Sequence, residues 1–399
     1  MTHFPNTQTN EERLRMKTTM AVSLTLVTAL AQSACSSSDS NNGGKVQFTA
    51  SGEVLALGGY AFPPAGADDP AFADGWEIKF SKLLVTVDHI TLSENPDKSP
   101  SDQSKTGKKV AQVDGPWAID LHQGGPIAGK GGSDEQAYPI TTLDHQNLNG
   151  NAAFDETVRY AFGFDLIPAT SDATMLQLDT SDSDYADMVK NGWVVLYVGT
   201  ATYRGDSSCT SSDDSFDFST LPTKVDFKLG FKSPTTYVNC QNPDNDPAKA
   251  LGDEEHQRGI QVKSNQTVTA QVTVHTDHPF WESFTHDSPA HFEQLAALAV
   301  KDAEGQYTVT MDETVGVDYT AFQFGKDPLP WRACAPGYQP PNTNQQMGFD
   351  SLDVPHDPSG DPATSMRDYA DYLTYNQSTQ GHLNSDGLCF VSRNYPSPP

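Results

Sequence analysis

Residues 225–231 read VDFKLGF, and every second residue of this stretch is apolar. Successive side chains of a β-strand point to opposite faces, so one buried face would hold Val225, Phe227, Leu229 and Phe231. Residues 268–274, VTAQVTV, repeat the same alternation. A period of two is typical of a half-buried strand, whereas an amphipathic helix has a period of about 3.6 residues. These two stretches predict a β-rich fold.

Similar runs, rich in β-branched and aromatic residues, recur along the chain between clusters of Gly, Asp, Pro and Ser. The remaining runs are Val46–Leu57, Trp76–Leu92, Val110–Leu121, Val158–Leu166, Met175–Leu178, Trp193–Tyr203, Ile260–His275 and Tyr307–Met311. In a chain of 399 residues, 30 Gly and 27 Pro are too many for an all-helical protein. We therefore expect a mostly β fold, an antiparallel β-sandwich over residues 45–322. A division into two halves near residue 205 is the alternative.

Two segments have helical patterns, and the end of the chain has none. Residues 288–301 begin with Ser288 as a suitable N-cap and Pro289 as a suitable first helical residue. Their apolar stripe consists of Phe292, Leu295, Ala296, Ala299 and Val300. A shorter helix is expected over residues 184–191. Clusters of Pro and Asn after Phe322 predict a long irregular C-terminal segment over residues 323–399.

The first 34 residues have the features of a processing signal. Lys17 supplies a positive charge, residues 21–30 form a short apolar stretch, and Ser33 and Ala34 are small residues before Cys35. This pattern resembles a bacterial lipoprotein signal, in which the Cys becomes the lipidated N-terminus. Gln32 departs from that pattern, because an apolar residue is expected there. A secretory signal cleaved near Ala34 is therefore the alternative.

Both interpretations of the signal place the mature chain outside the cytoplasm. Residues 35–44, rich in Ser, Asn and Gly, would form a flexible tether. By resemblance to the sorting rule of enteric bacteria, the Ser after Cys35 indicates the outer membrane of a Gram-negative bacterium, and it leaves open whether the periplasmic or the outer leaflet holds the lipid. No mature segment approaches the 18 or so consecutive apolar residues of a membrane span. The expected membrane contact is therefore the lipid anchor alone.

The charge balance disfavours nucleic acids and anionic lipid surfaces as partners. Lys and Arg number 25 against 52 Asp and Glu, a formal net charge of −27 at pH 7. Nucleic acids and anionic lipid surfaces attract basic proteins, so neither is expected to bind this acidic chain. The charge suits cations as small partners, and it leaves open whether a protein or a glycan also binds.

Besides Cys35, the chain holds Cys209, Cys240, Cys334 and Cys389. An even number of cysteines outside the cytoplasm predicts disulfides, and none of the four belongs to a C-x-x-C motif. Three pairings are open. We favour Cys209–Cys240 with Cys334–Cys389, because each would close a polar insertion at its base.

The densest cluster of metal-binding residue types is VHTDHPFWESFTHDSPAH, residues 274–291. It contains His275, Asp277, His278, His286 and His291. A strand end, a loop and a helix start can direct imidazoles to one point, and carboxylates can complete the set of ligands. Imidazole nitrogen suits zinc or copper, and we expect one of them here. The alternative is structural, with the histidines hydrogen-bonded at one end of the sandwich; H-E-x-x-H is absent.

A candidate calcium loop lies at residues 145–156, HQNLNGNAAFDE. Asn147, Asn149 and Glu156 would be ligands 3, 5 and 12 of an EF-type loop, with Gly150 at the tight turn. His145 stands where Asp is required, and an Asn-Gly turn explains the same residues. The acidic runs 179–187 and 244–255 are weaker calcium candidates that also suit solvated loops.

Two resemblances accompany these motifs. The segments DGWEIKFSKLLVTVDHITL, GPWAIDLHQGG and GIQVKSNQTVTAQVTVHTDH resemble, in that order, strands of bacterial surface lipoproteins of unknown function. The four cysteines and the Trp and His content are faintly similar to periplasmic copper-binding partner proteins of methanobactin-type operons, whose Met/Trp run is absent here. Neither resemblance implies a catalytic residue.

Enzyme motifs are also absent: the sequence has no G-x-S-x-G, no P-loop and no G-x-G-x-x-G opening a helix. We expect hydrogen-bonded structural roles for His89 and His122. The residues Trp76, Trp117 and Trp193 would fill the core or offer a platform for a sugar. The leading hypothesis is a non-enzymatic, lipid-anchored protein that binds a divalent metal. The alternatives are an adhesion or carbohydrate-binding module with structural calcium, and a metal-dependent hydrolase.

Overall fold

The computed structural model describes residues 43–394, apart from 67–68, 131–133, 212, 242–256, 285–287, 323–328, 339–355, 362–363, 381 and 384–386. The predicted signal over residues 1–34, Cys35 and most of the predicted tether over residues 35–44 lie outside these residues. Of the helices in the described part, none is long and apolar enough to cross a membrane.

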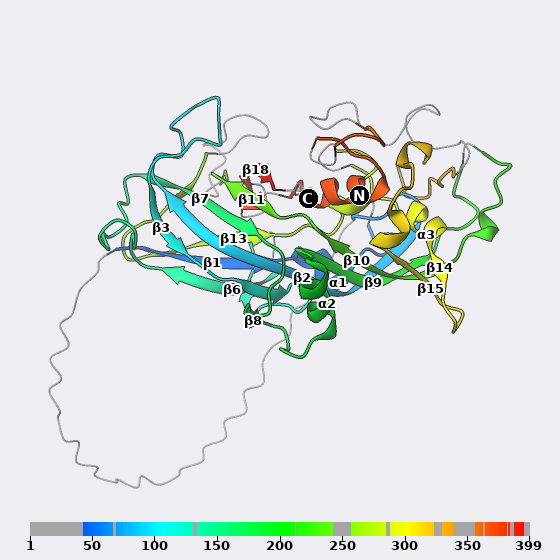
Figure 1. The fold of residues 1–399 in the computed structure, drawn as a ribbon, viewed down its shortest axis with the longest axis horizontal. Coiled ribbons are helices and arrows are strands. Elements are labelled where there is room, and N and C mark those ends of the chain that lie inside the picture. Colours follow the sequence, from blue (N-terminus) through cyan, green and yellow to red (C-terminus); the bar gives the residue numbers. More distant parts are fainter. Residues whose placement is uncertain are drawn as a thin grey trace, which may run out of the picture. The chain divides into compact units, whose positions relative to one another are not determined.

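The described strands form two sheets (Figure 1). The first sheet has six strands in the order β17-β16-β13-β1-β6-β5. Their bounds are β1 Lys45–Ser51, β5 Ile127–Ala128, β6 Gln136–Leu143, β13 Thr267–Thr273, β16 His382–Leu383 and β17 Gly387–Leu388.

The second sheet is larger and is built around β2, Trp76–Ser93, which pairs with β3, β4, β7 and β9. Its main path runs β14-β15-β10-β9-β2-β7-β11-β18. The other strands are β3 Lys109–Val113, β4 Trp117–Asp120, β7 Arg159–Leu166, β8 Thr174–Leu176, β9 Val195–Tyr203, β10 Lys224–Phe231, β11 Thr235–Val238, β12 Ile260–Gln261, β14 Val300–Lys301, β15 Tyr307–Thr310 and β18 Phe390–Arg393.

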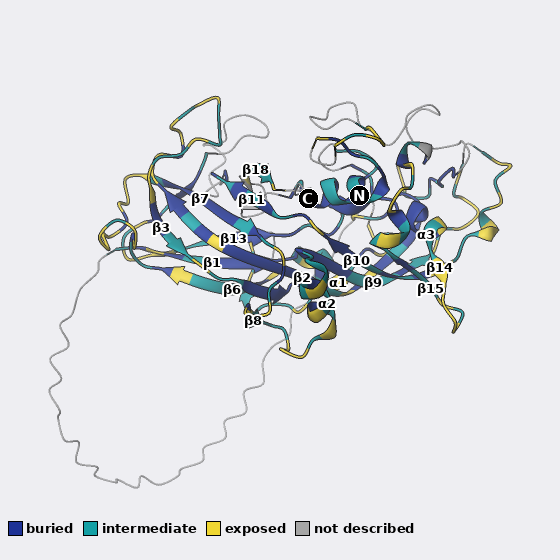
Figure 2. Ribbon diagram, in the orientation of Figure 1, coloured by how far each residue is buried: buried dark blue, intermediate teal, exposed yellow. Residues whose placement is uncertain are grey.

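The core lies where side chains of both sheets meet, and Figure 2 shows buried residues along both sets of strands. Phe48 of β1 stacks on Phe162 of β7, with ring centroids 5.4 Å apart. The VDFKLGF stretch is β10, and its four alternate apolar residues are 0–2% exposed. The predicted mostly β, largely antiparallel sandwich is confirmed, although β1–β13, β4–β8 and β10–β15 pair in parallel.

The described residues form one compact unit. The division considered near residue 205 would separate β9 from β10, and these two strands are antiparallel neighbours over eight residue pairs.

Four α-helices are present among the described residues: α1 Glu53–Gly58, α2 Ser183–Asn191, α3 Glu293–Leu298 and α4 Tyr369–Gln377. The expected helix over residues 184–191 is α2, which is capped by Asp182 through the backbone N–H groups of Asp184 and Tyr185. Short 3-10 helices are η1 Phe218–Thr220, η3 His278–Phe280, η4 Met311–Thr314 and η5 Tyr319–Ala321.

The predicted helix over residues 288–301 is wrong at both ends, because α3 spans only Glu293–Leu298 and the exposed Val300 belongs to β14. The chain before α3 is extended: Glu282 N donates to Pro289 O at 2.9 Å, and His291 N donates to Phe280 O at 2.8 Å. The helix begins later because a distant side chain caps it. Asp74 Oδ2 accepts hydrogen bonds from the backbone N–H groups of Phe292 and Glu293, at 2.7 and 2.8 Å.

The two disulfides are Cys209–Cys334 and Cys240–Cys389, so the favoured pairing is wrong. Long-range backbone pairing sets this connectivity. Thr210 and Ala333 form an antiparallel bridge beside the first disulfide. Gln241 N donates to Leu388 O, at 2.6 Å, beside the second. Both disulfides fasten the C-terminal segment to the sandwich, and this segment also contributes α4 and strands to both sheets.

Candidate metal centre

The candidate metal centre lies where two parallel strands end. In the pairing of β1 with β13, Ser51 lies opposite Thr273, and Val274 N donates to Ser51 O at 2.9 Å. Because both strands run in the same direction, the residues that follow them emerge at the same edge of the sheet. Glu53 therefore begins α1 close to the point where His275 leaves β13.

The structure brings His275, Asp277 and His278 together, with one ligand atom from each within 4.8 Å of the others. The two imidazole rings have centroids 5.2 Å apart and are inclined by 42°. The turn into η3, which starts at His278, returns the chain so that these side chains meet. Two imidazoles and a carboxylate within this distance can hold a divalent metal.

Other side chains orient the three residues. Nδ1 of His275 lies 3.5 Å from Glu53 Oε2. Nδ1 of His278 lies 2.7 Å from Thr379 Oγ1, whose hydroxyl donates to the carbonyl of Asn376. The Thr379 oxygen must then accept the proton of His278 Nδ1, which leaves the lone pair of that ring on Nε2. Contacts of this kind fix the tautomer and direction of metal-binding histidines.

Trp281 contacts two members of the same group, Asp277 and His278. Its Nε1 donates to Asp277 Oδ2 at 3.1 Å, and its indole stacks on His278 with centroids 3.8 Å apart. Tyr197 Oη and Gln380 Nε2 both donate to the carbonyl of His275, at 3.0 and 2.9 Å. The backbone and the side chains of the group are thus held by several elements of the fold.

His291 does not belong to this group, which corrects the prediction for that residue. It lies in a buried charge cluster composed of Asp74, Glu282, His291, Glu293 and Arg332. His291 Nε2 is 2.7 Å from Glu282 Oε2, and its ring stacks on Trp331 with centroids 4.5 Å apart. The extended chain at residues 289–291, paired with residues 280–282, carries His291 into this second location. His286 lies outside the described residues.

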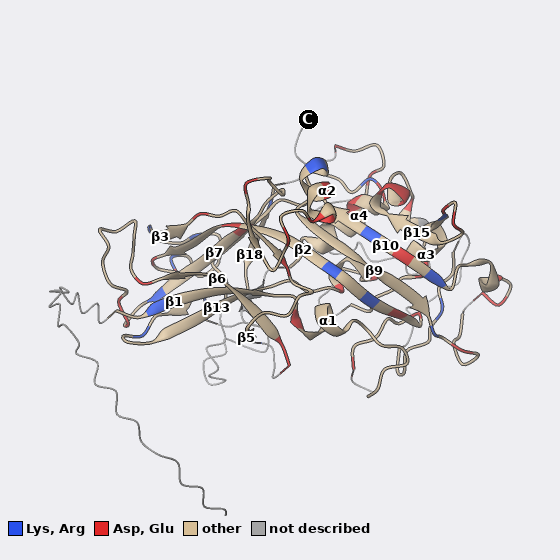
Figure 3. Ribbon diagram, turned by 90° about the horizontal axis from the view of Figure 1, so that it is seen from below, with Lys and Arg blue, Asp and Glu red and all other residues tan. Residues whose placement is uncertain are grey.

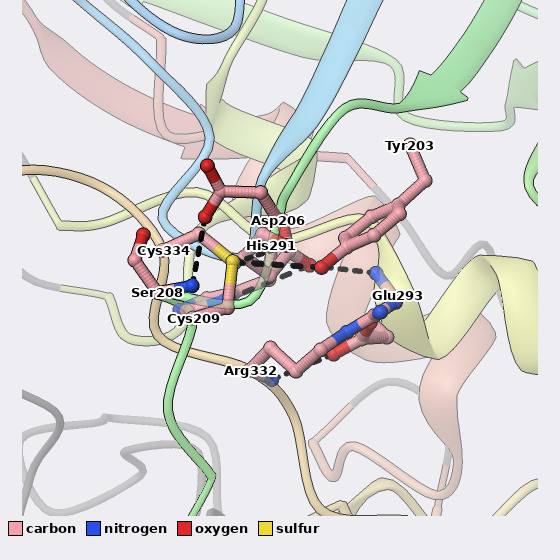
Figure 4. Close-up of a disulfide and its surroundings, with 9 residues drawn as sticks. Tyr203, Asp206, Ser208, Cys209, His291, Glu293, Arg332 and Cys334 are labelled. Carbon is pink, nitrogen blue, oxygen red and sulfur yellow. Dashed lines mark hydrogen bonds and ion pairs between the residues drawn. A yellow bond between two sulfur atoms is a disulfide. The ribbon is translucent and has the colours of Figure 1, made fainter. Parts of the chain in front are cut away.

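The Cys209–Cys334 disulfide lies beside this cluster, and Figure 4 shows His291, Glu293 and Arg332 next to it. Arg332 binds Glu293 through its backbone N–H at 2.7 Å and its Nε at 2.6 Å, and its guanidinium lies 3.5 Å from the centroid of the Tyr203 ring. Cys334 Sγ lies 3.3 Å from the carbonyl oxygen of Asp74. The first disulfide thus fixes the chain that carries Arg332 against α3.

Burial changes the protonation of this cluster. Burial, together with the charge of Asp74, raises the pKa of Glu293 to about 7. Burial also raises the pKa of Asp74, in spite of the nearby His291 and the two backbone N–H groups. Burial alone would lower the pKa of His291, but the hydrogen bond and charge of Glu282 raise it. All three groups therefore hold protons at higher pH than in an unfolded chain.

The candidate calcium ligands have separate partners. Asn147 Oδ1 accepts from Gln112 N at 3.0 Å, Asn149 Oδ1 accepts from Lys108 Nζ at 3.0 Å, and Glu156 Oε2 accepts from Ser264 N at 3.1 Å. The segment forms a tight turn closed by the bridge between Gln146 and Ala152. This arrangement favours the interpretation of residues 145–156 as an Asn-Gly turn over that of a calcium loop.

Of the two acidic runs, residues 244–255 lie outside the described part. In the run 179–187, Asp182 caps α2, while Asp184 and Asp187 pair with Lys228 at 2.7 and 2.6 Å.

Sequence reasoning missed a second group, Asp88, His89 and Asp114, whose ligand atoms also lie within 4.8 Å of one another. It forms at a bulge where the register between β2 and β7 shifts after Asp88. Asp88 Oδ1 accepts from the backbone N–H groups of His89 and Gly115, both at 2.7 Å. No break in alternation marks this bulge, because burial is continuous from Leu83 to Asp88; the structure marks it by the left-handed backbone of His89, with φ 46°. The structural role expected for His122 is confirmed by its contact with Ala56 O at 2.6 Å.

No family model, curated protein or solved structure matches the chain.

Proposed function

We propose that this protein is a non-enzymatic, lipid-anchored extracytoplasmic protein that binds one divalent transition metal through His275, Asp277 and His278. The observation that carries the proposal is the convergence of their ligand atoms within 4.8 Å. Cys35 would carry the lipid, as its signal-like surroundings indicate, and the predicted location is the outer membrane. The two disulfides support an oxidising compartment.

Zinc or copper(II) is the proposed metal. Because Nδ1 of each imidazole faces Glu53 or Thr379, we assign Nε2 of each ring to the metal. Asp277 would supply a carboxylate oxygen, and a water molecule or an added ligand would complete the coordination. Soft copper(I) is disfavoured because Cys209, Cys240, Cys334 and Cys389 are all in disulfides.

Calorimetric titration of the demetallated full chain with Zn²⁺ and Cu²⁺ tests the proposal. We expect one equivalent to bind at pH 7.5 and weaker binding at pH 5.5, because protons compete for imidazole nitrogen. Replacing His275 and His278 together by Ala should remove most of the affinity. Glu53→Gln should cost about tenfold or more, as loss of an orienting carboxylate does in other metal sites.

His145→Ala is the matched control, because this partly exposed histidine pairs with Asp144 and lies outside the group. Its affinity should equal that of the unmodified protein. Unchanged affinity in the double variant would place the metal elsewhere and contradict the proposal, as would the absence of heat from the unmodified protein.

A further inference from the structure

A cavity of about 980 Å³ lies beside the second sheet, lined by β10, η4, α4 and the turn from α2 into β9. Figure 3 shows β10 running beside α4 and carrying both basic and acidic positions. The volume is typical of sites for small organic ligands. None of the three proposed metal ligands lines the cavity, so it is a separate site.

Aromatic side chains form part of the cavity wall. Trp193 lies against Gly230 so closely that a Cβ atom on Gly230 would be 2.2 Å from the indole ring. The bare backbone of Gly230 therefore allows the indole to lie flat on the strand at the edge of the cavity. By contrast, Trp76 and Trp117 are 0% and 8% exposed and fill the core. Of the three tryptophans considered as sugar platforms, Trp193 is the one that lines this cavity.

The cavity concentrates positive charge in a strongly acidic protein. Lys228, Lys232, Arg367 and Arg393 line it, against Asp312, Asp368 and Asp371, whereas the whole chain has 25 basic and 52 acidic residues. Lys228 pairs with Asp184 and Asp187, and Arg367 with Asp371.

Two of these cations are placed to receive an anion. Lys232 is exposed, and the Arg393 guanidinium stacks on the Tyr375 ring, 4.1 Å from its centroid. Arg393 Nε donates to Ser378 Oγ at 2.8 Å, which fixes the direction of the guanidinium. Neither Lys232 nor Arg393 forms an ion pair with a carboxylate within the described ranges.

We propose that this cavity binds a carboxylated oligosaccharide, such as a chain of uronic acid residues. A sugar ring would stack on Trp193, its carboxylate would meet Lys232 and Arg393, and its hydroxyls would donate to the exposed Asp312. An adjoining hollow of about 350 Å³ over β9, β10 and β15 shares Lys228 and Thr310 with the cavity. This extension gives room for more than one sugar ring.

The test is a titration of the full chain with trigalacturonate, in which binding is measured by tryptophan fluorescence and by calorimetry. A chelator is present throughout, so that the result does not depend on the proposed metal centre. We expect saturable binding, and no comparable binding of the neutral trisaccharide maltotriose or of inorganic phosphate. Lys232→Gln and Arg393→Gln should each weaken binding about tenfold or more, because each removes a charge-assisted hydrogen bond. Trp193→Ala should abolish it.

Lys224→Gln is the matched control, because Lys224 is an exposed lysine of the same strand outside the cavity. It should bind trigalacturonate like the unmodified protein. Because Lys232 is exposed, Lys232→Gln should fold normally. This variant therefore tests the proposed carboxylate contact even if Trp193→Ala fails to fold. Equal binding of maltotriose, binding of phosphate alone, or full affinity in Lys232→Gln would overturn the proposal. So would the absence of trigalacturonate binding.

Discussion

Glu293 makes the free energy of unfolding depend on pH in a direction that can be measured. Its side chain is fully buried at the start of α3, and Arg332, Asp74 and His291 are the charged groups that surround it. Its pKa of about 7 lies above the ordinary value of 4.5. Between these two pH values the folded protein holds a proton that the unfolded chain has released. The stability that this residue contributes is therefore present at low pH and is lost as the pH rises through 7.

The magnitude follows from the size of the shift. A change from 4.5 to about 7 corresponds to about 3 kcal/mol of unfolding free energy, at roughly 1.36 kcal/mol per unit. Glutamine is neutral at every pH and keeps the shape of the protonated side chain, so Glu293→Gln should remove this part of the pH dependence. Part of this stability is already lost at pH 5, where the unfolded side chain has largely ionised, so the loss between pH 5 and pH 8 should be smaller in the variant by roughly 2 to 3 kcal/mol. Asp74 and His291, whose pKa values are also raised, contribute in the same direction and leave a residual slope.

Urea unfolding at pH 5 and pH 8, monitored by tryptophan fluorescence and circular dichroism, measures the change in unfolding free energy between the two pH values. Oxidising buffer keeps the disulfides intact, and a chelator removes metal. Glu304→Gln is the control, since Glu304 is exposed and should show the pH dependence of the unmodified protein. An equal slope in Glu293→Gln and the unmodified protein would refute the reasoning, and so would a reduced slope in the control.

Two further predictions concern covalent structure. Non-reducing peptide mapping should recover Cys209 linked to Cys334 and Cys240 linked to Cys389, whereas a peptide joining Cys209 to Cys240 would contradict the described backbone pairing. Cys35→Ser should release the protein from the membrane fraction, because lipid on that residue is the expected attachment, and continued membrane association would exclude the lipoprotein interpretation.

The sequence predicted those parts of the fold that depend on neighbouring residues. The alternation in residues 225–231 identified β10 because strand side chains alternate whatever the partner strand is. The α2 helix was predictable from an acidic cap directly before a short helical pattern. A comparable local signal was overlooked at α4, where Asp368 caps the first turn through the backbone N–H of Asp371.

The remaining features depend on residues far apart in the sequence. The α3 helix starts at Glu293 because Asp74, more than 200 residues earlier, accepts its first N–H groups. Disulfide connectivity was not predictable for the same reason, since the bridge between Thr210 and Ala333 selects the partner of Cys209. Cysteine spacing carries no information on such pairing.

The candidate metal centre combines residues that are close together in the sequence with residues that are far apart in it. His275, Asp277 and His278 were predictable because they lie within four residues at the end of one strand. Glu53 was not, because its place beside His275 depends on the parallel register of β1 and β13. His291 was assigned to the wrong cluster because its position depends on backbone pairing with Phe280.

The C-terminal segment completes both clusters and is an integral part of the fold. It supplies Thr379 and Gln380 to the residues that orient His275 and His278, and it supplies Trp331 and Arg332 to the buried charge cluster. The two disulfides fasten this segment to the sandwich at two separate points. Strands β16 and β18 pair with β13 and β11, and α4 packs on η3, so the two disulfides add covalent links to a segment that the sheets already bind. The favoured pairing of Cys334 with Cys389 would have closed a loop within the segment and formed no covalent link between the segment and the sandwich.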